Sequence, residues 1–435
     1  MSKHRNTDTD LSTFERHESG VRTYCRSFPV IFDRAVGSEM FDRSGCPYID
    51  FLAGAGALNY GHNNPELKSA LVDYITRDGI THGLDLATDA KEKFLQTLVS
   101  TVLEPRNLEY KVMFPGPTGT NAVEAALKLV RKVTGRTNII SFTNAFHGMT
   151  LGALSLTGNS MKREGAGLGL GGVTTLPFDG YLGEGVDTLD YLQALLNDGS
   201  SGLDKPAAFI VETIQAEGGI NEASISWLRR LERLANENDI LFIVDDIQVG
   251  CGRTGPFFSF EDAGLDPDVV CLSKSLSGFG LPLSVVLFRP ELDVWQPGEH
   301  NGTFRGNNHA FVTATAALEL YWKDDAFTRD VASKAATVSS TLAELAATHG
   351  GEHRGRGLIQ GLAFENRNVA SAISRACFER GLVIETAGPD DEVLKLLPSL
   401  TIDVPMLVSG LDIIAESMSE VFADTEESEP IRKAS

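Results

Sequence analysis

Two neighbouring segments decide the fold: ILFIVDDIQVGCGRTG at residues 240–255 and PDVVCLSKS at residues 267–275. Each opens with a short run of β-branched and other apolar residues, which is typical of a strand buried on both faces of a parallel sheet. The first run ends in Asp245 and Asp246, and the second ends in Lys274. Ligands of an open parallel sheet bind beyond the carboxyl ends of its strands, so these three side chains mark the candidate site.

The two aspartates are adjacent on a strand and therefore face opposite sides, so they cannot both point at one ligand. A carboxylate buried there needs a cationic partner, because an unpaired buried charge is costly. Taken singly, a strand-end lysine is commonly a solvated or salt-bridged residue, and a strand-end aspartate is commonly a cap. Together, Asp245 and Lys274 predict a carboxylate and an amine that converge on one cofactor from neighbouring strands.

Similar apolar runs lie on both sides of these two segments, at residues 110–114, 137–142, 207–215 and 283–288. We expect each to be a central strand of a parallel sheet. Amphipathic helical patterns separate several of them, at residues 121–133 and 226–238 for example. This alternation predicts an α/β fold with a doubly wound sheet. After about residue 310 the pattern is mainly helical and then gives short strands near residues 357–364 and 393–398.

The same patterns predict how the chain divides into domains. The expected regions are an N-terminal arm with part of a small domain (1–55), a large domain (56–315), a C-terminal small domain (316–423) and a disordered tail (424–435). The tail is expected to be disordered because it is rich in charge and poor in large apolar residues.

Composition excludes several classes of protein. The 435 residues carry 59 acidic and 38 basic side chains, a formal net charge of −21, which argues against a nucleic-acid or membrane partner. Five scattered cysteines without a CxxC motif argue against a disulfide framework or a structural zinc site, and no metal site is expected. The sequence shows neither an apolar signal segment nor a run long enough to span a membrane. We therefore expect a cytoplasmic protein.

One motif is discounted. The segment EGAGLGLGG at residues 164–172 contains the GxGxxG spacing of dinucleotide-binding turns. No strand precedes it and no clear helix follows it, so the context that this motif requires is missing. We interpret the segment as a flexible loop near the site.

The two deciding segments resemble the signature of class III aminotransferases, which use pyridoxal phosphate. Six further segments resemble the family in the family's own order, at residues 48–65, 116–132, 141–158, 211–219, 301–308 and 354–358. The resemblance covers nearly the whole chain. It implies the type I fold of pyridoxal-phosphate enzymes, with a large, doubly wound, mostly parallel seven-stranded sheet domain and a smaller α+β domain built from both termini.

The resemblance also implies roles for single residues. Lys274 is expected to bind the cofactor covalently and then to move the proton between substrate and cofactor. Asp245 is expected to pair with the pyridine nitrogen and Gln248 to hydrogen-bond near the ring hydroxyl. The backbone N–H groups of Gly119 and Thr120 are expected to bind the phosphate at a helix N-terminus.

Other roles rest on single matches. Phe146 is expected to stack on the cofactor ring, although an ordinary core aromatic is the commoner fate of a phenylalanine. His147 fits a cofactor contact and a structural histidine equally well. Glu212 is expected near the ring. Thr303 resembles the threonine that reaches the phosphate from a neighbouring subunit, which implies at least a homodimer.

The substrate end of the site departs from the family. Members that use glutamate usually carry an arginine before an LLPPL-like segment, whereas VLKLLPSL at residues 393–400 places Lys395 there. Lysine offers a point charge in place of a bidentate fork. Glu217 matches the glutamate that pairs with this cation in ω-amine enzymes, and the pair is expected to open for the second carboxylate of glutamate or 2-oxoglutarate.

Within the family, the combination of segments most resembles the diaminobutyrate-forming branch, which serves ectoine biosynthesis. The substrates implied are L-glutamate, 2-oxoglutarate, L-aspartate 4-semialdehyde and L-2,4-diaminobutyrate, used with ping-pong kinetics. Two alternatives remain open. One is a class III enzyme for γ-aminobutyrate, acetylornithine, or diaminobutyrate of another pathway. The other is a non-catalytic protein on the same fold, against which the presence of both Lys274 and Asp245 speaks.

Overall fold

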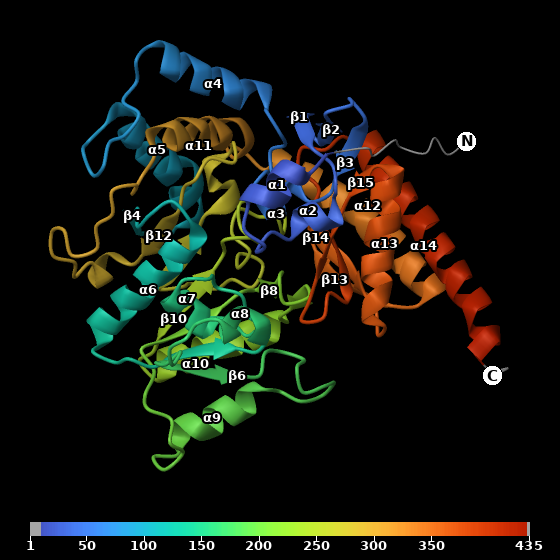
Figure 1. Ribbon diagram of the computed structural model, residues 1–435. Helices are drawn as coiled ribbons and strands as arrows, with labels where there is room; N and C mark the ends of the chain where they lie inside the picture. Colours follow the sequence, from blue (N-terminus) through green and yellow to red (C-terminus); the bar gives the residue numbers. More distant parts are fainter. Residues whose placement is uncertain (1–9, 433–435) are drawn as a thin grey trace.

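A computed structural model describes residues 10–432 (Figure 1). Its large domain is built on a seven-stranded sheet in the order β4-β12-β11-β10-β7-β5-β6. The strands are β4 (Lys111–Met113), β5 (Ile139–Phe142), β6 (Val173–Leu176), β7 (Ala208–Val211), β10 (Leu241–Asp245), β11 (Val269–Leu272) and β12 (Val285–Phe288). Strand β12 runs antiparallel to both of its neighbours, β4 and β11, and the other neighbouring pairs of this sheet are parallel. The prediction of a mostly parallel seven-stranded sheet is therefore confirmed.

The strands are apolar on both faces because each face carries its own hydrophobic core. In β10, Phe242 and Val244 belong to one core and Ile243 to the other, since successive side chains point in opposite directions. Helix α10 (Ile225–Glu237) contributes to the first core, and α6 (Gly119–Thr134) contributes to the second. Helices thus cover both faces, and the sheet is doubly wound, as expected.

Three details of the sheet differ from the sequence prediction. The run at residues 110–114 was expected to be a central strand, and this is wrong, because β4 lies at one edge of the sheet. The run at residues 283–288 was expected to be a parallel strand, and this is wrong, because β12 is antiparallel to β11. The chain between β11 and β12 holds only the short turn η3 (Lys274–Ser277) and lacks the helix with which parallel crossovers are made. Edge strand β6 was missed because Leu176 is its only fully buried residue, so its pattern does not stand out.

The small domain joins the two ends of the chain. One sheet has the order β1-β2-β3-β15 and a second has the order β13-β14-β17-β16. Their strands are β1 (Phe32–Val36), β2 (Glu39–Asp42), β3 (Pro47–Asp50), β13 (Glu352–Arg356), β14 (Ile359–Ala363), β15 (Leu382–Val383), β16 (Glu385–Ala387) and β17 (Val393–Leu396). Because β3 and β15 pair in parallel, residues from both ends share one sheet, which confirms the predicted α+β domain.

Three long helices cover this domain and lie together on one side of the molecule (Figure 1). They are α12 (Ala326–His349), α13 (Arg367–Arg380) and α14 (Val404–Arg432), and α14 packs against the other two. Helix α14 extends into the region from residue 424 onward where a disordered tail was expected, and residues 433–435 lie outside the described part of the chain, as do residues 1–9 of the expected arm.

The remaining elements connect these units. They are α1 (Ser12–His17), α2 (Tyr24–Ser27), α3 (Ala53–Gly56), α4 (Pro65–Thr76), α5 (Asp89–Leu98), η1 (Val99–Leu103), η2 (Glu104–Arg106), α7 (Leu151–Leu156), α8 (Ser160–Glu164), α9 (Leu189–Asn197), β8 (Ile214–Gln215), β9 (Asn221–Glu222), η4 (Pro290–Leu292) and α11 (Asn308–Tyr321). The glycine-rich segment after α8 is a loop that leads into β6 and is followed by no helix, as predicted. Within residues 10–432, no helix is both long and apolar enough to cross a bilayer.

Candidate active site

A cavity of about 360 Å³ opens beyond the carboxyl ends of the central strands, and we call it the cofactor cavity. It lies where the sequence placed the site, and nine of the eleven predicted site residues line it. These nine are Gly119, Thr120, Phe146, His147, Glu212, Glu217, Asp245, Gln248 and Lys274. The structure therefore brings together residues that are up to 155 positions apart in the sequence, from Gly119 to Lys274.

Asp245, at the end of β10, has its cationic partner in His147. Oδ2 of Asp245 lies 2.7 Å from Nδ1 of His147, and its Oδ1 accepts a hydrogen bond from the backbone N–H of Ile247 at 3.2 Å. Burial opposes a charge on the imidazole, but the Asp245 carboxylate outweighs it and raises the pKa of His147. The outer ring nitrogen, Nε2, is buried without a hydrogen-bond partner among the described residues.

Asp246 points away from the cofactor cavity, as expected for the neighbour of Asp245 on a strand. Its Oδ2 accepts a hydrogen bond from the backbone N–H of Ser259 at 3.0 Å. Burial raises the pKa of Asp246 to about 7. The two aspartates thus differ in their surroundings: Asp245 faces the cavity, and Asp246 packs into the protein interior.

Lys274 enters the cavity from the turn that follows β11. Its backbone adopts φ of 47°, a conformation that non-glycine residues adopt rarely and that is typical of functional sites. Nζ of Lys274 donates a hydrogen bond to the carbonyl oxygen of Ala55 at 2.9 Å. Burial lowers the pKa of Lys274, which favours the neutral, nucleophilic amine.

Gln248 lies beside this lysine. Its Nε2 donates to the same Ala55 carbonyl at 2.9 Å and to Oε1 of Glu217 at 3.1 Å. Its Oε1 is buried and has no hydrogen-bond partner within the described chain. An acceptor of this kind, aimed into a cavity, is available to a ligand that donates a hydrogen bond.

The N-terminus of α6 forms one wall of the cavity. Thr118 is the N-cap residue, and its backbone N–H donates to Oδ1 of Asn121 at 3.1 Å. The amides of Gly119 and Thr120 lie in the first turn, where a helix offers no acceptor for them. A Cβ at Gly119 would lie 3.0 Å from the side chain of Ile247, so a larger residue would crowd the cavity. This arrangement suits an anionic group such as a phosphate.

Phe146 and Glu212 lie together in another part of the cavity wall. The backbone N–H of Phe146 donates to Oε1 of Glu212 at 2.9 Å. Burial raises the pKa of Glu212 to about 8, so this carboxyl group is largely protonated at neutral pH. Nζ of Lys162 lies 4.4 Å from the centroid of the Phe146 ring, and Lys162 also lines a second, larger groove.

A second group of charges, which we call the distal cluster, consists of Lys395, Glu217, Glu385 and Tyr24. Nζ of Lys395 lies 2.7 Å from Oε1 of Glu217 and 3.0 Å from Oε1 of Glu385. The hydroxyl of Tyr24 donates to Oε2 of Glu385 at 2.9 Å. Burial opposes a charge on Lys395, yet the two carboxylates raise its pKa, and Lys395 in turn is the main cause that lowers the pKa of Glu217 against the effect of burial.

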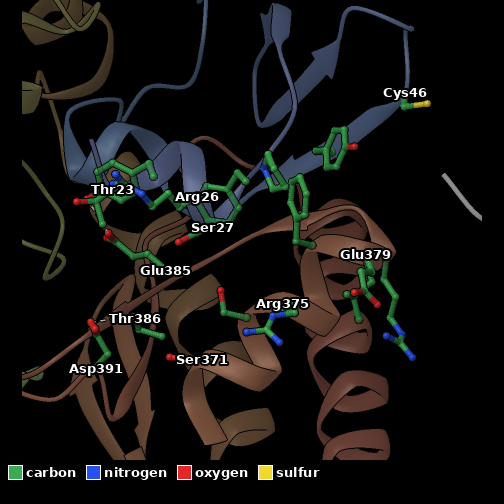
Figure 2. Close-up of a pocket in the computed structure, with 18 of the residues that line it drawn as sticks. Thr23, Arg26, Ser27, Cys46, Ser371, Arg375, Glu379, Glu385, Thr386 and Asp391 are labelled. Atoms are coloured by element: carbon green, nitrogen blue, oxygen red, sulfur yellow. Dashed lines mark hydrogen bonds between the residues drawn. The ribbon is translucent and has the colours of Figure 1, made fainter. Parts of the chain in front are cut away.

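The distal cluster borders a groove of about 1980 Å³ between the N-terminal segment and α13. Figure 2 shows Glu385 close to Thr23 and Arg26 of that segment, while Arg375 and Glu379 lie further along the groove. Glu217 lines both the groove and the cofactor cavity, so the two spaces meet at this residue.

Two predicted residues lie outside the cofactor cavity. Lys395 is fully buried behind Glu217 and reaches the cavity through it. Thr303 is exposed in the loop before α11 and does not line the cavity of its own chain.

The sequence analysis missed two contributors to the site. The Ala55 carbonyl accepts hydrogen bonds from both Lys274 and Gln248, but a backbone group leaves no side-chain signal. Glu385 could have been found, because it is an acid within the apolar run LVIET at residues 382–386. A buried acid in such a run needs a partner, and here the partner is Lys395.

The cavity fits the cofactor that the sequence resemblance implies. It offers a lysine amine, a carboxylate fixed by His147, an aromatic ring at Phe146, an unpartnered acceptor at Gln248 and the N-terminus of α6. Pyridoxal phosphate carries an aldehyde, a ring nitrogen, a flat face, a ring hydroxyl and a phosphate, and the cavity provides a group for each.

Comparison with known proteins agrees with this chemistry. A diaminobutyrate–2-oxoglutarate transaminase of Halalkalibacterium halodurans is 60% identical over 415 residues, which cover 95% of this chain and 97% of that protein. The protein of the same name from Bordetella parapertussis is 57% identical over 428 residues, 98% of each chain.

Solved structures show the same architecture. An ornithine aminotransferase of Toxoplasma gondii is 26% identical with a TM-score of 0.83, covering 95% of both chains. An aminotransferase of Bacillus anthracis shares the fold with a TM-score of 0.84 at 23% identity, covering 94% of this chain and 98% of that one. The family described as aminotransferase class-III matches residues 22–418. The chain therefore belongs to the class III aminotransferases, enzymes that work with pyridoxal phosphate.

Proposed function

We propose that the protein transfers an amino group from L-glutamate to L-aspartate 4-semialdehyde, giving 2-oxoglutarate and L-2,4-diaminobutyrate. The observation that carries the substrate assignment is the 60% identity to a diaminobutyrate–2-oxoglutarate transaminase over 95% of the chain. The product would feed ectoine biosynthesis as its first step.

Lys274 and Asp245 are the catalytic residues in this proposal. Pyridoxal phosphate, when bound, supplies a ring that accepts the electrons released when the substrate carbon loses a proton. Lys274 attaches the cofactor, and its amine then removes and returns the proton at the substrate carbon that bears nitrogen. Its lowered pKa suits this work, because the neutral amine is the form that takes up a proton.

Asp245 holds a proton on the ring nitrogen. The contact of 2.7 Å with His147 fixes the carboxylate so that it faces the cofactor cavity. Gln248 receives the ring hydroxyl at its free Oε1.

The remaining cofactor contacts orient the ring. Phe146 covers one face, and Glu212 holds the Phe146 backbone in place. The amides of Gly119 and Thr120 bind the phosphate. Thr303, exposed on its own chain, reaches the phosphate of a second subunit, so that the active unit is at least a homodimer.

Lys395 and Glu217 select the two substrates. With glutamate, Glu217 moves aside and Lys395 binds a substrate carboxylate; with diaminobutyrate, the pair stays closed. Their separation of 2.7 Å is that of the closed pair.

We also place the enzyme in the cytoplasm, because all five cysteines are free thiols, as suits a reducing compartment.

A half-reaction titration tests the proposal. The purified holoenzyme is mixed separately with L-2,4-diaminobutyrate, γ-aminobutyrate and acetylornithine, and the absorbance of the bound cofactor is followed. Diaminobutyrate is expected to react with the highest kcat/KM. Fast reaction of acetylornithine with no reaction of diaminobutyrate would replace this assignment with another class III specificity.

A further inference from the structure

A continuous chain of contacts links the reactive amine to Glu385. Lys274 and Gln248 donate to the same Ala55 carbonyl, Gln248 donates to Glu217, and Glu217 contacts Lys395. Lys395 then lies 3.0 Å from Glu385. Each link is between 2.7 and 3.1 Å long, and Glu385 lies near enough to Lys274 for its charge to act on the pKa of that amine.

The distal cluster holds more carboxyl groups than cationic groups, and burial raises the pKa of one of them, Glu385. Its two carboxylates, Glu217 and Glu385, share the single ammonium of Lys395. One oxygen, Oε1 of Glu385, is buried, and its contact is Nζ of Lys395 at 3.0 Å, the same ammonium that serves Glu217. Glu385 is 6% exposed, so water does little to satisfy this oxygen. Because one ammonium serves two carboxyl groups, a second cation can bind beside Glu385.

We propose that Glu385 is a specificity residue that binds the α-ammonium group of diaminobutyrate and of aspartate 4-semialdehyde. The inference rests on the proposed function, since both molecules carry an amino-acid head at the end remote from the reacting carbon. Tyr24 positions the carboxylate by donating to its Oε2 at 2.9 Å.

Glutamate and γ-aminobutyrate carry no second ammonium group that the Glu385 carboxylate could bind. The amine of glutamate is the one that reacts, so glutamate presents a carboxylate at its remote end, which Lys395 receives. γ-Aminobutyrate is diaminobutyrate without the α-amine. A buried carboxylate built to bind an ammonium group is left unpaired by such an analogue, and sites of this kind discriminate strongly.

The test compares these two amines on holoenzyme carrying Glu385→Gln, which keeps the shape of the side chain and removes its charge. The matched control is Glu379→Gln, which removes an exposed carboxylate of the same groove that contacts neither Lys395 nor Tyr24 in the described structure. Half-reactions give kcat/KM for diaminobutyrate and for γ-aminobutyrate. If γ-aminobutyrate reacts too slowly, its inhibition constant against diaminobutyrate replaces its kcat/KM.

Glu385→Gln is expected to lower kcat/KM for diaminobutyrate by about 10- to 100-fold, the usual range for a charged hydrogen bond. The value for γ-aminobutyrate should change by less than about threefold, the KM for glutamate should not rise, and Glu379→Gln should resemble wild type. Tyr24→Phe should shift the ratio of the two amines in the same direction by a smaller factor.

Equal losses for both amines would overturn the proposal, because Glu385 would then act only as a structural counter-ion of Lys395. Unchanged kcat/KM values for both amines would overturn it as well. Failure of the proposed function looks different: the wild-type enzyme itself would not react with diaminobutyrate.

Discussion

Oδ2 of Asp245 lies 2.7 Å from Nδ1 of His147 in the protein interior, where the imidazole is fully buried and the carboxylate is 4% exposed. Each group stabilises the charge of the other, because neither meets enough water to be solvated alone. The pair therefore fixes the Asp245 carboxylate at the wall of the cofactor cavity, and this carboxylate raises the pKa of His147 against the effect of burial.

Asp245→Asn is expected to lower kcat by roughly 10²- to 10⁴-fold, since an amide cannot hold a proton on the ring nitrogen. Steady-state kinetics with diaminobutyrate and 2-oxoglutarate measure the effect. Asp246→Asn is the matched control, because Asp246 lies next in sequence but faces Ser259. Its kcat should stay within about threefold of wild type. A near-normal kcat for Asp245→Asn would remove Asp245 from the mechanism.

Lys274→Ala is expected to abolish transamination and the covalent link to the cofactor. Borohydride reduction followed by intact mass measurement reads the link directly: the wild-type chain gains the mass of the cofactor, and the variant does not. Lys162→Ala, which removes the ammonium 4.4 Å from the Phe146 ring, is the control and should keep the label. A labelled Lys274→Ala chain would mean that another lysine carries the cofactor.

Lys395→Met is expected to raise the KM for glutamate by more than about tenfold, because the substrate carboxylate loses its cation. The KM for diaminobutyrate should rise less, since Lys395 stays paired with Glu217 when that amine is bound. The variant also leaves two buried carboxyl groups without a counter-ion, so Glu217→Gln is added in a second variant, which returns the distal cluster to its wild-type net charge. Equal increases for both substrates in the double variant would show that Lys395 is not the carboxylate clamp.

The sequence predicted the central sheet well because its strands are buried on both faces, as in β10, where consecutive residues enter opposite cores. Antiparallel β12 could not be distinguished from a parallel strand, since burial on both faces gives the same apolar run in either direction. The lining of the cofactor cavity was predictable where a reactive side chain forms it, as at Lys274. It was not predictable where a backbone carbonyl is the hydrogen-bond acceptor, as at Ala55.

Asp246 should make stability fall as the pH rises. Its pKa is about 7 in the folded protein, raised by burial from an ordinary value of 3.8. Between these two values the unfolded chain has already lost a proton that the folded protein retains, so folding becomes less favourable as the pH increases and the penalty is complete above about pH 7. Since one pKa unit corresponds to about 1.4 kcal/mol, the penalty is on the order of 4 kcal/mol.

Asp246→Asn removes this titration. The apparent unfolding temperature of the variant minus that of wild type is therefore expected to increase as the pH is raised from about 5 to about 8. Thermal unfolding of both proteins at these pH values measures the difference, and comparing the two proteins cancels the contributions of all other groups. The amide retains an acceptor for the Ser259 N–H, so the local hydrogen bond survives the change. If the difference between the two proteins does not depend on pH, Asp246 is ionised throughout this range and its burial does not govern its charge.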